Sequence, residues 1–363
     1  MKRLMALLLA LVFTLTLAGC ANTQVPETVG SLGSVEIPGS LYRLVQYNNY
    51  SGAASLTSYD QSQLVQVLKA TVTDPVSGEE VPVLQYIEDH SLEQLYYYAG
   101  VLSWFDELGL SLDQETLDTI NTTVDQIWNY NGSHYEKNGI DRDTLALYME
   151  QGYKAQALLE GVYGPEGITP VTQEEYLDYM ENQCYAGEVL YLPISSMDGS
   201  VTADQETMEE IAQWAETAAG AINGPEAFTV DQAALEYIPV VMELLGQELP
   251  SEEDILSGYT GQGLFLPEDL AYYEEEDGTN PVLDVIKNLE VGQAGVIFTG
   301  TAYQVFLRQD PVESCPLEQW QDRLLEGMKV TAIQDQFVER GKSLENHLDQ
   351  EALDQISPGT IQF

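Results

Sequence analysis

Apolar residues in the first half of the chain recur at the spacing of helices. Residues 92–109 form a long apolar-rich stretch that ends at a glycine, as helices often do. Residues 111–114, Ser-Leu-Asp-Gln, fit a capping box before the apolar stripe of residues 117–128. A second capping box at residues 172–175 precedes one more helix. We therefore predict that residues 35–183 are all-helical.

The pattern changes at Cys184. The apolar segment of residues 189–194 predicts a short strand, because it is too short for a helix and is followed by polar turn residues. Two helices are predicted next, one over residues 206–219 and one after Thr229. A short strand is predicted in the glycine-rich stretch of residues 257–270, and a brief helix over residues 281–289.

Residues 294–310 predict a β-hairpin. Apolar residues alternate with their neighbours on both sides of Thr299-Gly300-Thr301, which supplies the turn. Strand, helices, strand, helix and hairpin together predict an α+β domain with a small mixed or antiparallel sheet. Helical periodicity returns after Pro311, with an apolar stripe over residues 320–337. Because that stripe has to be buried, we expect this helix to pack on the N-terminal helices, so that the α+β domain is an insertion within one helical lobe.

The N-terminus has the pattern of an export signal. Lys2 and Arg3 precede an apolar run over residues 4–17, and the run stops at Leu-Ala-Gly-Cys, which ends at Cys20. This tetrapeptide looks like a bacterial lipobox, in which the chain is cut on the N-terminal side of the cysteine and the thiol carries the lipid; the alternative is an ordinary secretory signal with a chance cysteine. We predict a signal peptide over residues 1–19 and a lipidated tether over 20–33, which anchors the protein to the extracytoplasmic face of a cell membrane.

Charge and composition exclude several classes of function. The chain has 59 acidic and 13 basic residues and a net charge of −46, so nucleic acid and anionic lipid surfaces are poor partners. The three histidines lie far apart in the sequence, and the acidic run at residues 274–278 has the character of a solvated loop, so we predict no metal site. No phosphate-binding or dinucleotide-binding glycine motif is present, and we predict no cofactor.

Three segments together resemble the extracytoplasmic foldase lipoproteins of the PrsA/SurA family. They are GSVEIPGSLYRLVQY from residue 33, YEKNGIDRDTLALYM from residue 135, and LEVGQAGVIFTGTAYQVFLRQD from residue 289. The last is similar to the end of a parvulin-type peptidyl-prolyl isomerase domain. The resemblance implies an N-terminal helical chaperone lobe similar to that of SurA, residues 34–183, completed by residues 313–350 and followed by a tail, 351–363. It also implies a parvulin-like domain, residues 186–312, inserted in that lobe.

The residues that carry parvulin chemistry are replaced in this sequence. Parvulins have two histidines in the sheet, and the resemblance places these positions at Tyr191 and Gln304. We therefore assign no catalytic residue. Phe265, Phe298 and Tyr303 are candidates for an apolar pocket that binds substrate, although a simple role in the sheet core fits the two phenylalanines as well.

Cys184 and Cys315 bracket the predicted insertion. Because an inserted domain leaves and rejoins its host through adjacent linkers, we expect their Cα atoms to lie about 4.4–6.8 Å apart, within reach of a disulfide. The alternative is two unrelated thiols.

The sequence favours a membrane-anchored folding helper for exported proteins, with unfolded or partly folded chains as partners. The chain has 22 tyrosines and 8 phenylalanines. Tyrosine suits a client-binding surface, because its side chain is large and rigid and ends in a polar hydroxyl group. One alternative is an active peptidyl-prolyl isomerase whose chemistry needs no histidine. Another is a solute-binding lipoprotein, although that class requires repeated βαβ units, which the long helical first half disfavours.

Overall fold

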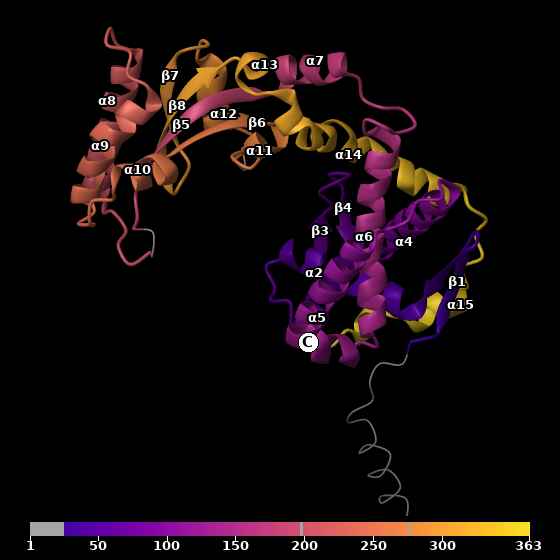
Figure 1. The fold of residues 1–363 in the computed structure, drawn as a ribbon. Helices are drawn as coiled ribbons and strands as arrows, with labels where there is room; N and C mark the ends of the chain where they lie inside the picture. Colours follow the sequence, from indigo (N-terminus) through magenta and orange to yellow (C-terminus); the bar gives the residue numbers. More distant parts are fainter. Residues whose placement is uncertain (1–24, 197–198, 276) are drawn as a thin grey trace, which may run out of the picture. The chain divides into compact units, whose positions relative to one another are not determined.

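The structure, a computed structural model, describes residues 25–196, 199–275 and 277–363. It is an α+β protein that divides into two compact units (Figure 1). The first unit combines the residues up to Ile168 with Thr331–Phe363, and the second is Thr169–Val330. The second unit contains the whole of the predicted inserted domain, residues 186–312. The predicted signal peptide and Cys20 lie outside the described residues.

The first unit is mostly helical. Its elements are β1 (Thr28–Leu32), β2 (Val35–Pro38), α2 (Gly39–Ser55), α3 (Leu64–Leu68), β3 (Thr71–Thr73), β4 (Glu80–Pro82), α4 (Val83–Glu107), α5 (Gln114–Lys137), α6 (Arg142–Tyr163), the last part of α14 (Leu317–Ser343), α15 (Gln350–Gln355) and the short 3-10 helix η1 (Pro358–Thr360). Helix α5 begins after Asp113, whose side chain accepts a hydrogen bond from the backbone of Thr116. The sequence pattern predicts Ser111 as the cap of this helix, whereas the structure shows that the cap is Asp113.

Two antiparallel hairpins correct the prediction that this part of the chain is all-helical. Strand β1 pairs with β2, and β3 pairs with β4. In β2 the side chains alternate, with Val35 and Ile37 buried and Glu36 exposed, which is the pattern of a strand with one face on the core. Strand β1 also corrects the predicted tether over residues 20–33, because Val29 and Leu32 are fully buried.

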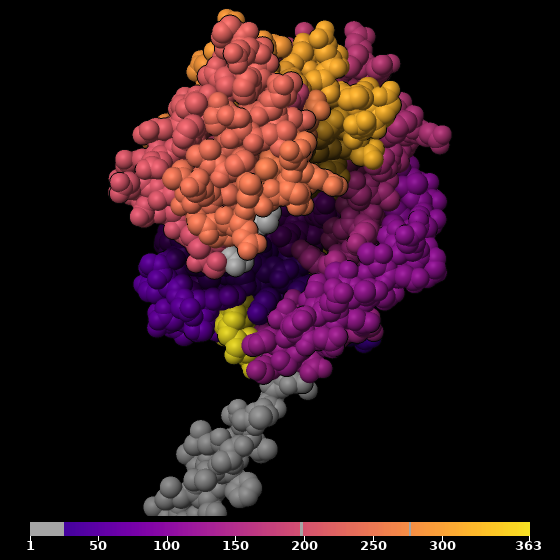
Figure 2. Space-filling model, turned by 60° about the vertical axis from the view of Figure 1, so that its left-hand side comes forward, coloured from indigo at the N-terminus to yellow at the C-terminus, as the bar shows by residue number. Residues whose placement is uncertain are grey.

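The C-terminal residues 351–363 are part of the first unit and do not form a loose tail. They contain α15 and η1, and Ile356 and Ile361 are buried. The fully buried Arg43 of α2 holds this segment, because its guanidinium donates hydrogen bonds to the Ser357 carbonyl oxygen at 3.1 Å and to the Thr360 hydroxyl. Figure 2 shows the yellow C-terminal residues between indigo and magenta parts of the same unit. The two isoleucines are too apolar to remain in water, which explains the difference from the prediction.

Helix α14 contributes to both units. Its last part packs on α4 so closely that a Cβ added at Gly100 would collide with the Phe337 carbonyl oxygen, and one added at Gly341 with the Tyr96 carbonyl oxygen. The Phe337 ring lies edge-on to Trp104, with 5.8 Å between the ring centroids. The predicted packing on the N-terminal helices therefore holds for residues from 331 onward, whereas Trp320 and its neighbours belong to the second unit.

The second unit has a four-stranded antiparallel sheet between helices. Its elements are α7 (Gln173–Gln183), β5 (Tyr185–Pro193), α8 (Gln205–Asn223), α9 (Val230–Leu244), α10 (Glu252–Tyr259), β6 (Thr260–Phe265), α11 (Pro267–Ala271), α12 (Pro281–Asn288), β7 (Ala294–Phe298), β8 (Ala302–Gln309), α13 (Pro311–Ser314) and the first part of α14. The strand order is β6-β5-β8-β7. The predicted strands and hairpin are present, and the sheet is purely antiparallel.

Both faces of this sheet are covered. One face packs against α8, α9 and α10 through a core that includes Leu190, Leu192 and Val305. The opposite face packs against α11 and α12 through a core that includes Val189 and Phe306. Successive residues of a strand point to opposite faces, so each central strand contributes apolar residues to both cores. This arrangement explains the nearly continuous apolar run in β5.

Candidate functional site

The two positions assigned to the parvulin histidines lie opposite each other at the centre of the sheet. Tyr191 of β5 is the register partner of Gln304 of β8, and Gln304 is also paired with Ile297 of β7. Alternation along the strands places both side chains on the face of the α11–α12 core, the face that holds Ile297 and Phe306. Both are half-buried. Burial, reinforced by Tyr273, raises the pKa of Tyr191, so its hydroxyl stays protonated near neutral pH.

This pair of side chains has little capacity for acid–base chemistry. Neither Tyr191 nor Gln304 makes a side-chain hydrogen bond to the described residues, and all three histidines of the sequence lie in the first unit. A neutral phenol and an amide supply hydrogen bonds but do not exchange protons readily at neutral pH. The site can therefore orient a peptide group, and it has no proton donor or acceptor of suitable pKa at these two positions.

The three candidates for a substrate pocket do not come together. Phe265 of β6 lies on the α11–α12 face, edge-on to Phe306, with 5.5 Å between the ring centroids. Phe298 and Tyr303 are register partners in the β7–β8 hairpin, and their ring centroids are 4.8 Å apart. Tyr303 packs toward the α8–α9–α10 core, and Phe298, at 43% exposure, lies on the same side. Phe265 is thus on one face of the sheet and the other two are on the opposite face.

The cysteines Cys184 and Cys315 are both buried and both have free thiols in the structure. Cys184 lies between α7 and β5, and Cys315 follows α13, which packs against α7 and β5. Burial raises the pKa of Cys184 to about 12, and Glu268, Asp269 and Cys315 add to the effect. The two thiols are thus close enough to interact, and the disulfide stays a prediction.

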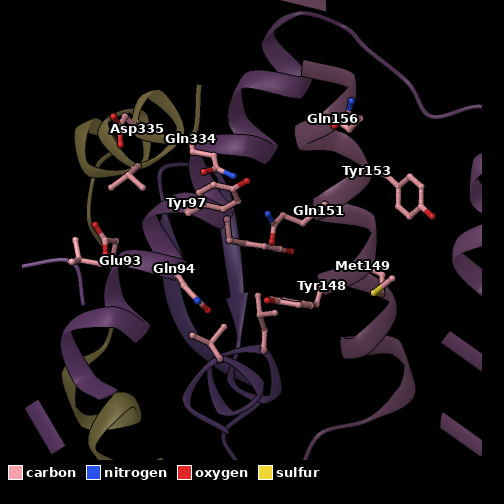
Figure 3. Close-up of a pocket in the computed structure, with 16 residues that line it drawn as sticks. Glu93, Gln94, Tyr97, Tyr148, Met149, Gln151, Tyr153, Gln156, Gln334 and Asp335 are labelled. Carbon is pink, nitrogen blue, oxygen red and sulfur yellow. The ribbon is translucent and has the colours of Figure 1, made fainter. Parts of the chain in front are cut away.

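A cavity of about 840 Å³ lies within the first unit, among α2, α4, α6, α14 and the β3–β4 turn (Figure 3). Its walls combine aliphatic residues, four tyrosines, four glutamines and one methionine. The lining residues are Leu41, Val45, Val76, Glu93, Gln94, Tyr97, Tyr98, Tyr148, Met149, Gln151, Gly152, Tyr153, Gln156, Gln334, Asp335 and Val338. The only signal of this region in the sequence is the abundance of tyrosines, which does not show where a cavity lies.

Two tyrosines of the cavity, Tyr97 and Tyr98, have a raised pKa and are neutral near pH 7. Burial raises the pKa of Tyr97, and the nearby Tyr148 adds to the effect. Burial and the carboxylate of Glu150 raise the pKa of Tyr98 to about 12. The Tyr97 ring is fixed edge-on to Phe337, with 5.4 Å between the centroids. The cavity therefore offers rigid aromatic walls with hydroxyl groups, and its only charged lining residues are the acidic Glu93 and Asp335.

Neither a metal site nor a membrane span is found in the described part of the chain. No group of three or more histidine, cysteine, aspartate or glutamate side chains there is placed to hold a metal ion. Within the same residues, no helix combines the length and the apolar character needed to cross a bilayer.

Comparison with known proteins gives similarity to solved structures alone. No protein-family model matches the sequence, and no curated protein matches it. Among solved structures, the chain is similar to the crystal structure of foldase protein PrsA from Streptococcus pneumoniae str. Canada MDR_19A, with 13% sequence identity and a TM-score of 0.37. The match covers 79% of this chain and 99% of that one. Identity and TM-score at this level are too low to assign a fold or a function to this chain.

Proposed function

We propose that this protein is a membrane-anchored extracytoplasmic foldase or chaperone, which holds segments of exported, incompletely folded proteins in the cavity of its first unit. The observation that carries this proposal is the lining of that cavity. Tyrosine, methionine and glutamine side chains contact apolar and polar groups alike, and aliphatic residues complete the walls. Such a surface suits many peptide sequences better than one small molecule with fixed charges.

The anchor and the inserted domain are parts of the same proposal. The lipidated Cys20 would hold the protein at the extracytoplasmic face of the membrane, and the net charge of −46 would keep it soluble there and favour basic or unfolded clients. The second unit would be a parvulin-like domain, inserted between residues 186 and 312, with degenerate isomerase activity. The pairing of Tyr191 with Gln304, and the lack of a histidine in that unit, support this assignment.

The alternatives receive less support from the described residues. A solute-binding lipoprotein would need parallel strands joined by helices, whereas every strand pair in the described part of the chain is antiparallel. An active isomerase would need a polar network that favours the twisted peptide bond, and the side chains of Tyr191 and Gln304 make no hydrogen bond to the described residues.

A cavity-blocking variant tests the proposal. Gly152 lines the cavity, and a Cβ added there meets nothing within 4 Å, so Gly152→Tyr would place a ring in the cavity without a backbone clash. Gly220 of α8 is also helical and equally open, so Gly220→Tyr is the matched control. We expect the full-length protein and the control to suppress aggregation of an unfolded, proline-poor client, and the Gly152 variant to do so poorly. Equal suppression by both variants would show that the cavity is not the client site.

A further inference from the structure

Two glutamines of the cavity have side-chain amides with no partner in the described protein. Gln151 of α6 is only 8% exposed, yet its amide makes no hydrogen bond to the described residues. Gln94 of α4 has a fully buried Oε1 that likewise has no hydrogen-bond partner. Both residues line the cavity, and Figure 3 shows them on facing helices, with their side chains directed into the space between α4 and α6.

The unpartnered Oε1 of Gln94 is unfavourable for the unliganded protein. A buried donor or acceptor without a partner loses its hydration and gains no hydrogen bond in return. Methionine has nearly the same size and shape as glutamine and carries no such cost, and Met149 occupies a comparable place in the same wall. Glutamines at these two positions are therefore better explained by a partner that enters the cavity than by the folding of the unit itself.

The chemistry of the lining defines the class of that partner. A primary amide presents a carbonyl acceptor and an NH₂ donor, and a peptide main chain presents the complementary N–H donor and carbonyl acceptor. An anionic ligand is disfavoured, because the charged lining residues, Glu93 and Asp335, are both acidic. Tyr148 lies near enough to Tyr97 to raise the pKa of Tyr97, and the two rings offer walls for side chains of many shapes.

We propose that Gln94 and Gln151 bind the main-chain amides of an extended client segment, so that the cavity recognises a peptide largely independently of its side chains. This inference rests on the proposed function and makes it specific. The preferred occupant is a neutral or basic segment in an extended conformation, because its main-chain N–H and carbonyl groups are not already paired within the peptide.

Matched peptides and isosteric variants test this assignment. The first peptide is neutral, proline-free and unmodified, and the second has the same side chains with N-methyl groups on alternate main-chain nitrogens. Binding of each is measured by fluorescence anisotropy with the full-length protein and with the Gln94→Met and Gln151→Met variants. Gln334→Met is the control, because Gln334 lines the cavity but is exposed at its rim.

We expect each of the first two variants to bind the unmodified peptide about five- to tenfold more weakly, as loss of one net hydrogen bond predicts, and the Gln334 variant to bind it normally. N-methylation should weaken binding to the unaltered protein and have a smaller effect on the Gln151 variant. The Gln94 variant should also melt at a higher temperature than the unaltered protein, since it removes a buried oxygen that has no partner, whereas a structural role for Gln94 would lower its melting temperature.

The outcomes separate this inference from the proposed function. If the unmodified peptide binds and Gly152→Tyr blocks it, but both glutamine variants bind it normally, the cavity is a client site and main-chain recognition by these amides is refuted. If the peptide does not bind the unaltered protein, or Gly152→Tyr does not affect its binding, the proposed function fails and this inference fails with it.

Discussion

The close contact between α4 and α14 predicts that Gly100→Ala will destabilise the protein. A Cβ at Gly100 would meet the Phe337 carbonyl oxygen, which belongs to the backbone of α14 and cannot rotate away. Alanine in the interior of α4 should itself stabilise the helix by about 1 kcal/mol relative to glycine. Overpacking in a close contact costs about 1–3 kcal/mol, and a backbone obstacle belongs at the upper end of that range. The net destabilisation should therefore be about 2 kcal/mol.

Gly52→Ala is the matched control for this variant. Gly52 lies in α2, and the nearest atom to an added Cβ is the Tyr86 hydroxyl oxygen at 4.0 Å, which is an ordinary contact. The same substitution should there raise stability by up to about 1 kcal/mol. The two variants thus have opposite expected signs, and their difference isolates the contact between α4 and α14.

Urea unfolding monitored by tryptophan fluorescence measures both variants. Trp104 lies against Phe337, so its emission reports separation of α14 from α4. A midpoint for Gly100→Ala equal to or above that of the unaltered protein would refute the close packing of these helices. It would also call into question the cavity wall that Gln334, Asp335 and Val338 of α14 supply.

Four further predictions concern the remaining features. In a protease-coupled assay with the full-length protein and a peptide that contains a prolyl bond, we expect no rate above the uncatalysed one and no change with Gln304→Ala. Oxidation should join Cys184 to Cys315, so that a thiol titration of the oxidised, unlipidated protein finds neither; two titrated thiols would contradict the bridge. Because the pKa of Cys184 is raised from 9.0 to about 12 in the folded state, unfolding releases a proton between these values. Stability should therefore fall as pH rises from about 9 to 12, and less steeply in Cys184→Ala, as urea titrations at each pH would show. Arg43→Lys should destabilise by about 1–3 kcal/mol in urea unfolding, since an ammonium group cannot reproduce both guanidinium contacts with the C-terminal segment, and an unchanged midpoint would refute the importance of those contacts.

The sequence predicted the elements whose apolar pattern and boundary signals agree. The hairpin of β7 and β8 has alternating residues around a turn in which Gly300 has a φ of 84°, a conformation that glycine adopts without strain. Helix α7 begins with the capping box of Thr172 and Glu175, as predicted. In these segments the local preference and the tertiary structure favour the same conformation, which is why the pattern was sufficient.

Short elements escaped prediction because their stability comes from distant residues. Strands β1 and β2 are only 5 and 4 residues long, and they are stabilised by buried contacts with helix α4 and the C-terminal helix α15. Helix α10 has only two buried residues, Ile255 and Tyr259, which is too few to form a recognisable stripe. The burial of residues 351–363 depends in the same way on Arg43, more than 300 positions earlier in the sequence.

The two candidate sites differ in how far a sequence can reveal them. The family resemblance predicts Tyr191 and Gln304 as one site, and their pairing in register follows from the strand pattern on either side. Gln94 and Gln151 could not, because a glutamine on an amphipathic helix has the same appearance in the sequence whether it faces water or a cavity. Only the folded structure shows that the Gln94 Oε1 atom is buried without a partner and that Gln151, a residue only 8% exposed, lines the cavity. A buried amide oxygen without a partner, such as Oε1 of Gln94, lowers the stability of the unliganded protein, and methionine at that position would remove this cost. At such a position, selection for binding can be distinguished from selection for folding.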